Sequence, residues 1–204
     1  MTDTLFRSKK KNIFVGGTSA VYLLIALLTS GIGSYNAPLW ASWRYILNTL
    51  FIWIFSNSST ICILLYLLTL KKEYRLKKWV LPFGFGLSCL YSLLSFSYSV
   101  SAVNAVVTPY SITIFIFTCL SALAVLLCFV GTLFDFEFLR LFQAGILLNV
   151  IVLIAVQITE TVFAVINGYF TTYGFAGLSL IALAEFLILV LFYISLVLLT
   201  TNKE

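Results

Sequence analysis

The chain has 204 residues, of which 62% are hydrophobic and only 9% are charged, and it contains no histidine. Soluble domains carry about 25% charged residues, so this composition excludes a soluble domain and predicts one all-α domain embedded in a lipid bilayer. The formal net charge of +5 comes from short basic clusters between apolar runs. Such clusters are typical of a membrane-topology signal and not of a nucleic-acid-binding surface.

Runs of about 20 apolar residues recur along the chain, as membrane-spanning helices require. They predict a bundle of six transmembrane helices at residues 13–32, 45–70, 79–100, 111–134, 138–166 and 175–200. With both termini in the cytoplasm, every lysine and arginine except Arg44 faces inward, as the positive-inside rule requires. The sequence therefore predicts a multi-pass integral membrane protein, N-in and C-in, with a single domain over residues 1–204.

Two groups of small residues predict close helix packing. Gly16 and Ala20 form a small-xxx-small pair in the first predicted helix. Gly84, Ser88 and Ser92 recur every four residues in the third predicted helix and form a stripe on one face. Because small side chains let two helices approach closely, we expect these surfaces to pack inside the bundle or against a partner chain.

Five successive polar residues, 56–60, interrupt the second predicted helix near the bilayer midplane. One interpretation, which we favour, is that they form hydrogen bonds to a neighbouring helix. The other is that the helix unwinds locally and lines a solute site, as in transporters with broken helices. In that case Asn57 belongs to the lining.

Polar residues mark one face of the fifth predicted helix. Asn149 and Glu160 are eleven residues apart and therefore share a helix face, and Gln157 lies one turn from Glu160. A helix that faces lipid does not need such residues, so we expect this face to point into the bundle. Glu185 is a second acidic residue, in the sixth predicted helix. Consecutive antiparallel helices are usually neighbours, so the two acids could face one cavity.

An ionised carboxylate at the centre of a membrane helix costs about 3 kcal/mol on the insertion scale. No basic residue is predicted at a matching depth, so each carboxyl is protonated, faces water, or pairs with a cation, a substrate or another subunit. We predict a substrate or ion site formed by Glu160, Glu185, Gln157, Asn149 and Asn57. The alternative is a protonated structural glutamate that helps two helices to associate.

We expect no catalytic residue, no metal ion and no cofactor. The absence of histidine excludes a histidine-based triad, a heme ligand and most zinc sites. The four cysteines lie in apolar runs without the spacing of metal ligands, and there is no glycine-rich phosphate loop. An acid dyad of Glu160 and Glu185 is the one enzymatic arrangement that stays open.

These features predict a small transporter, or the membrane subunit of a transport system, with an acidic site inside the bundle. The alternative is a non-catalytic accessory or assembly subunit of a larger membrane complex. Besides the lipid bilayer, the partners we expect are therefore other membrane-protein subunits, and we expect no nucleic acid.

Two six-helix families share features with the chain. Its size and topology resemble those of the vitamin-binding S-components of energy-coupling transporters, but residues 50–55 replace their small-residue-rich second-helix signature. The stretch Phe55-Ser56-Asn57-Ser58 resembles the aromatic-x-Ser-Asn stretch of the androgen-induced-gene type of lipid hydrolases. That family's activity needs a histidine, so this resemblance implies a membrane-embedded lipid-handling protein without histidine-based catalysis. We assign the chain to neither family.

Overall fold

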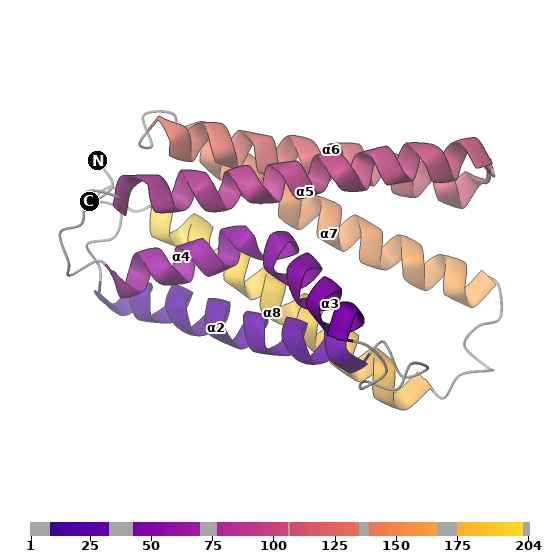
Figure 1. Cartoon of the computed structure of the whole chain (residues 1–204), viewed down its shortest axis with the longest axis horizontal. Coiled ribbons are helices and arrows are strands. Elements are labelled where there is room, and N and C mark those ends of the chain that lie inside the picture. Colours follow the sequence, from indigo (N-terminus) through magenta and orange to yellow (C-terminus); the bar gives the residue numbers. More distant parts are fainter. Residues whose placement is uncertain are drawn as a thin grey trace.

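The computed structural model describes residues 9–32, 43–69, 77–105, 107–134, 139–166 and 175–201, and the regular structure in these ranges is entirely α-helical (Figure 1). The helices are α2 (Lys9–Ile32), α3 (Trp43–Ser56), α4 (Ser58–Leu68), α5 (Lys77–Ala105), α6 (Pro109–Leu133), α7 (Leu139–Ile166) and α8 (Phe175–Thr201). The predicted all-α class is confirmed for these residues.

Within the described ranges, five helices are long and apolar enough to cross a membrane, namely α2, α5, α6, α7 and α8. The chain is therefore a helical membrane protein. Helices α3 and α4 have 14 and 11 residues and are each too short to cross a membrane, so they meet the same test only as a pair, and the chain bends by 70° between them. The predicted span 45–70 thus consists of two helices, and the bend falls in the polar run, where serine and asparagine side chains compete for backbone hydrogen bonds.

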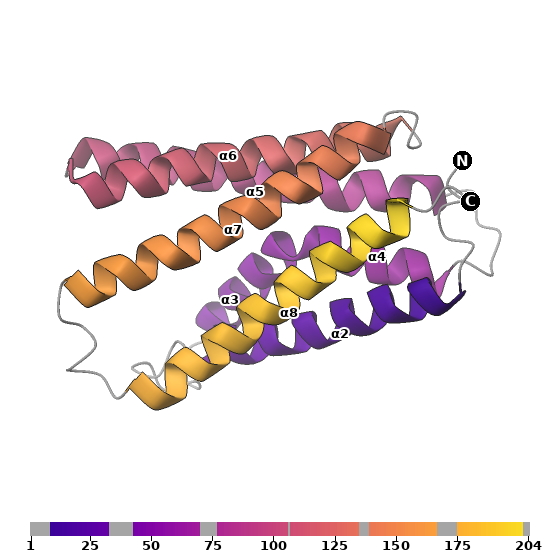
Figure 2. The same ribbon diagram turned by 180° about the vertical axis from the view of Figure 1, so that it is seen from behind.

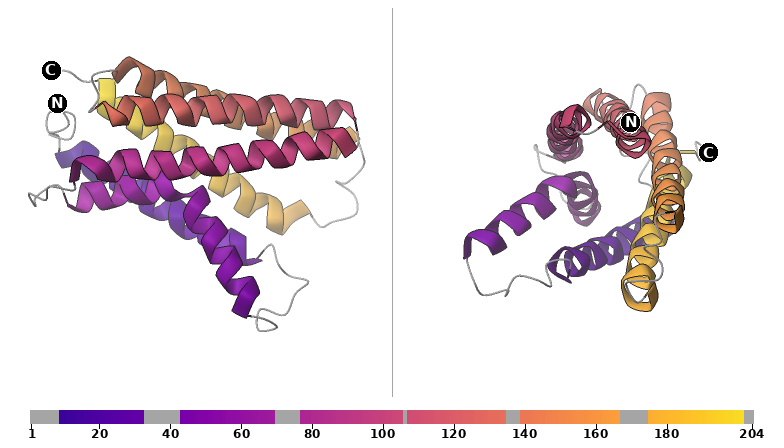
Figure 3. Two further views of the ribbon diagram at one scale, coloured as in Figure 1. Left: turned by 45° about the horizontal axis from the view of Figure 1, so that its top comes forward. Right: turned by 90° about the vertical axis from the view of Figure 1, so that its right-hand side faces the viewer.

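The helices form a closed ring. Each of α4, α5, α6 and α7 packs on the next helix in chain order, and α2 closes the ring by packing on both α4 and α8. Figure 3 (right) looks along the bundle and shows this order. We call the end at which α2 begins and α8 ends the near end, and the opposite end the far end (Figures 1 and 2).

The main buried apolar cluster lies in the near half of the ring. Every member belongs to the part of its helix that is closer to the near end. Phe85 of α5 and Phe142 of α7 meet edge to face across the interior, with ring centroids 5.6 Å apart. The cluster consists of Val15, Ile63, Tyr66, Leu81, Phe85, Cys128, Leu139, Phe142, Ile146, Phe192, Leu196 and Leu199.

Glycines allow α6 and α7 to form one of the closest contacts in the bundle. A methyl group at Gly145 would come within 2.6 Å of the Ala124 carbonyl oxygen and 2.7 Å of Cys128 Sγ. A methyl group at Gly131 would lie 2.7 Å from Cβ of Phe142. Any larger residue at these positions would push the two helices apart, so the glycines fix α7 against α6 in the near half.

The ring opens toward the far end. Helix α3 turns away from the other helices (Figure 3), and its large apolar side chains, such as Leu47 and Phe51, are exposed. Helix α7 also contacts α8 much less extensively than it contacts α6. The near half is therefore closely packed across the ring, whereas the far half has few contacts across it.

Candidate functional site

A cavity of about 300 Å³, called the polar cavity for its polar side chains, lies between α5, α6 and α7, and most of its surface is apolar. This volume is at the lower limit of typical small-molecule sites, roughly 300–1,000 Å³. Seven of the lining side chains are polar, although all three helices are apolar overall. These seven are Tyr91, Ser92, Ser95, Thr118, Ser121, Asn149 and Glu160.

Helix α7 supplies the amide and the carboxylate of the cavity. Asn149 and Glu160 both line it, and their separation of eleven residues corresponds to about 16 Å along the helix axis. Glu160 is closer to the far end, and its side chain is exposed. It is the one charged side chain among the lining residues, so the cavity has a single acidic group at its far end and neutral oxygens further in.

Asn149 also connects the cavity to α8 and α2. Its side chain lies next to the side chain of Tyr193 on α8. Tyr193 lies close to Tyr22 of α2, and Tyr22 lies close to Glu185 of α8. The side of the cavity that holds Asn149 therefore faces the ring interior.

The other residues of the predicted site lie elsewhere. Glu185 is half-buried on α8 close to Tyr22, and it does not line the cavity. Gln157 is half-buried on α7 and is also outside the lining. Asn57 is buried at the α3–α4 bend. The structure thus brings together Asn149 and Glu160, and it places the remaining three predicted residues apart from them.

The polar groups of the α3–α4 bend form hydrogen bonds to one another and to α5. The Asn57 side-chain amide donates to the Trp53 carbonyl oxygen (3.0 Å) and to Ser56 Oγ (3.1 Å). The Ser59 backbone N–H donates to Ser88 Oγ of α5 (3.1 Å). Ser88 therefore satisfies a backbone donor in the first turn of α4, where a helix has no acceptor of its own.

The small residues of α5 divide between two surroundings. At Gly84 a methyl group would lie 2.8 Å from Cys62 Sγ and 2.9 Å from the Ser58 carbonyl oxygen. This close approach places Ser58 Oγ 3.0 Å from the Gly84 carbonyl oxygen, to which it donates, and 2.9 Å from Ser88 Oγ. Ser92, one turn further on, lines the polar cavity.

The small pair of α2 has looser surroundings. A methyl group at Gly16 would meet Cδ1 of Leu67 at 3.7 Å, which is an ordinary van der Waals distance, and Ala20 is exposed.

Several residues that line the cavity do not belong to the site predicted from the sequence. Ser95 follows Ser92 by three residues on α5, and Ser121 follows Thr118 by the same spacing on α6. Spacings of three and four residues put side chains on one helix face, so both pairs carried a usable signal. Tyr91 carried none, because an aromatic residue in an apolar helix is common.

No family model, curated protein or solved structure matches this chain. The functional interpretation therefore starts from the chemistry of the cavity. Its lining offers hydroxyl, amide and carboxylate oxygens and no cationic side chain. The part of the chain that the structure describes contains no group of three or more histidine, cysteine, aspartate or glutamate residues that could hold a metal ion. The arrangement suits a cation or a hydrogen-bond donor held by one carboxylate and neutral oxygens.

Proposed function

We propose that the protein is a small multi-pass membrane transporter, or the membrane subunit of a transport system, and that it binds a cation or a cationic solute in the α5–α7 cavity. The observation that supports this most directly is the joint lining by Asn149 and Glu160 of one polar cavity inside apolar helices. In this proposal α3 and α4 together form one broken span, so that the protein has six spans.

The charge of the cavity supports a positively charged ligand. A carboxylate at the centre of a membrane helix costs about 3 kcal/mol on the insertion scale, and less toward the end of the helix, where Glu160 lies. The cavity lining provides no basic side chain to offset this cost. A bound cation would supply the missing charge. Oxygens such as those of Ser121 and Asn149 lie further into the cavity, and they would contact the cation after it moves inward from Glu160, since hard cations prefer oxygen ligands.

The distribution of basic residues supports an orientation in which the near end is cytoplasmic. Six of the seven lysines and arginines in the described ranges begin helices there, at Lys9–Lys11, Lys77, Lys78 and Arg140. Because cytoplasmic segments are enriched in these residues, the far end faces outward. Glu160 would then be reached from the outer side.

Binding to the purified protein tests the proposal. Isothermal titration calorimetry with sodium, potassium, calcium and guanidinium should detect at least one ligand. Glu160→Gln should weaken its binding at least tenfold, because the substitution removes the charge and keeps the shape. Glu185→Gln is the matched control, since it makes the same change outside the cavity, and it should leave the affinity unchanged. Equal effects of the two substitutions, or no binding at all, would refute this function.

An accessory subunit of a larger membrane complex is the second candidate. The exposed apolar side chains of α3, including Leu47 and Phe51, favour it, because a partner helix could cover them. The Gly84/Ser88 part of the small-residue stripe is not available for this purpose, since α4 already covers it. Purification in a mild detergent separates the two functions. A partner that co-purifies with the wild type, and is lost when Leu47 and Phe51 are replaced by alanine, would support the accessory function.

A further inference from the structure

The polar cavity presents hydrogen-bond acceptors to a ligand. Ser92 Oγ donates to the Ser88 carbonyl oxygen of its own helix (3.0 Å), and Thr118 Oγ1 donates to the Ile114 carbonyl oxygen of its own helix (2.9 Å). A hydroxyl group has one hydrogen, so after donating it the oxygen can only accept a further bond. The ionised carboxylate of Glu160 has no hydrogen to donate either. A ligand that binds these groups therefore needs hydrogen-bond donors.

Helices α6 and α7 are antiparallel and keep one register along their contact. Toward the far end, the ring centroids of Tyr110 and Phe163 lie 4.8 Å apart. In the near half, a methyl group at Gly131 would lie 2.7 Å from Cβ of Phe142. These two pairs are separated by 21 residues on each helix, so the same alignment holds for the cavity between them.

This alignment places apolar side chains directly inside the carboxylate. Phe117 of α6 is level with Val156 of α7, and both line the cavity. Val156 precedes Glu160 by four residues, which is about 6 Å along the helix toward the near end. Leu153 continues the apolar lining by one further turn. Because burial of apolar surface is favourable, a ligand held at Glu160 gains affinity from an apolar part next to its charge.

An inorganic ion would use little of this cavity. Its volume of about 300 Å³ corresponds to about ten water molecules at 30 Å³ each. Ca²⁺ takes six to eight oxygen ligands at 2.3–2.6 Å, whereas the polar side chains here are spread between Glu160 and Asn149, about 16 Å apart along α7. An organic cation can fill the volume and also cover the apolar lining.

We propose that the polar cavity binds a primary organic ammonium ion with a single positive charge and an apolar body. This substrate class rests on the proposed function, because it concerns the same cavity. The ammonium N–H groups donate to the Glu160 carboxylate, and the body packs on Phe117 and Val156. Glu160 is the one charged side chain of the lining, so it balances one positive charge and leaves none for a second.

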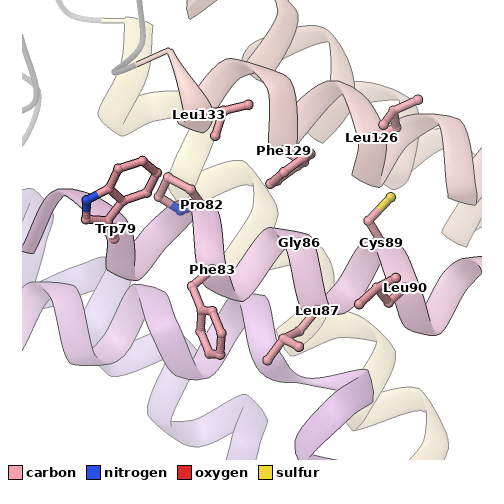
Figure 4. A pocket seen from close by; sticks show the side chains of 10 residues that line it. All are labelled: Trp79, Pro82, Phe83, Gly86, Leu87, Cys89, Leu90, Leu126, Phe129 and Leu133. Carbon is pink, nitrogen blue, oxygen red and sulfur yellow. The ribbon is translucent and has the colours of Figure 1, made fainter. Parts of the chain in front are cut away.

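The α5–α6 groove, a second hollow of about 530 Å³, can hold an apolar body but cannot pair with an ammonium group. Its lining contains no carboxylate and no hydroxyl group (Figure 4). Gly86 lines this groove and Ser95 lines the polar cavity, and nine residues are two and a half helical turns. The two hollows therefore lie on opposite faces of α5, and an experiment can separate them.

Isothermal titration calorimetry with four related ligands tests the proposal. Phenethylammonium has both the N–H donors and an apolar body, and methylammonium has the donors without that body. Trimethylphenethylammonium keeps the charge and the body without N–H donors, and 2-phenylethanol is neutral. Titration of protein-free micelles corrects each heat. We expect phenethylammonium to bind at least tenfold more tightly than the other three and than sodium or potassium, since each buried methylene contributes about fourfold.

Variants locate the bound body. Phe117→Ala should weaken phenethylammonium binding at least fivefold and leave methylammonium binding unchanged. Phe115→Ala is the matched control, because Phe115 contacts Phe96 (5.5 Å between ring centroids) and does not line the cavity. Gly86→Leu fills the α5–α6 groove, where a methyl group would already lie 3.2 Å from a ring, and it should also leave binding unchanged. If Phe117→Ala fails to fold, Val156→Thr replaces it, since it keeps the shape and adds a hydroxyl group.

The outcomes separate this inference from the proposed function. Sodium, potassium or calcium binding that Glu160→Gln abolishes, without phenethylammonium binding, would overturn the inference and leave the proposed function standing. No binding of any cation that depends on Glu160 would refute both. Equal affinity for phenethylammonium and its trimethyl analogue would also overturn the inference, and so would a loss of phenethylammonium binding in Gly86→Leu but not in Phe117→Ala.

Discussion

Substitution of Gly84 by alanine tests the packing of α4 against α5 most directly. The new methyl group would lie 2.8 Å from Cys62 Sγ and 2.9 Å from the Ser58 carbonyl oxygen. The carbonyl belongs to the backbone and cannot turn aside, so α4 and α5 must separate. That movement lengthens the bonds from Ser58 and Ser59 to α5, which now measure 3.0 and 3.1 Å.

The expected cost follows from three contributions. Overpacking a close contact costs about 1–3 kcal/mol. Each weakened interhelical hydrogen bond costs about 0.6 kcal/mol. Alanine stabilises a helix by about 0.8–1 kcal/mol relative to glycine, which acts in the opposite direction. We therefore expect Gly84→Ala to lower the free energy of unfolding by about 2 kcal/mol.

Gly17→Ala is the control, because the same methyl group meets nothing within 4 Å there and only the helix-propensity gain remains. Reversible unfolding in mixed micelles with increasing dodecyl sulfate, followed by far-ultraviolet circular dichroism, measures both variants. Replacing Cys62 by glycine should reduce the cost of Gly84→Ala by about 1 kcal/mol, because residues in contact are energetically coupled. If Gly84→Ala is as stable as Gly17→Ala, the close approach of α4 and α5 is wrong.

Three further predictions address the bend, the orientation and the core. Ser88→Ala should destabilise the protein by about 1 kcal/mol, whereas Ser97→Ala, at an exposed serine of the same helix, should change stability little in the same assay. A cysteine replacing Lys72 should react with an impermeant maleimide only from the cytoplasmic side. Labelling from the outer side would contradict the proposed orientation. Cross-linking cysteines placed at Phe85 and Phe142 should stop flux through proteoliposomes while cation binding persists, and unimpaired flux would contradict a route through the near half.

Helical periodicity was sufficient to predict which residues share a face, but not which helix that face meets. The spacing of Asn149 and Glu160 placed them on one side of a helix, and the structure has them in one cavity. The same reasoning expected Glu185 nearby, because α8 follows α7 in the chain. Glu185 lies apart from the cavity because α7 packs mainly on α6 and not on α8. Gly145 allows this close contact of α7 with α6.

The polar run at residues 56–60 shows a second limit of sequence reasoning. Its composition indicated either interhelical hydrogen bonds or a broken helix, and the structure contains both features. At the bend of 70° between α3 and α4, the Ser59 N–H donates to Ser88 Oγ of α5. Ser88 lies next to α4 because Gly84, one turn earlier on α5, lets the two helices approach closely. Gly84 comes 26 residues after Ser58 in the sequence. A local sequence pattern contains no information about a contact between residues so far apart in the chain.

In the proposed transport function, the position of the buried cluster in the near half would give the two sides of the protein different roles. A solute that arrives from the far side can reach Glu160 without displacing any member of the cluster. To leave on the opposite side in the proposed transport cycle, it would have to separate pairs such as Phe85 and Phe142, whose rings meet in the near half. The near half is therefore closed by its buried side chains and the far half is open, so in the proposed transport cycle the slow step would be the separation of the buried cluster.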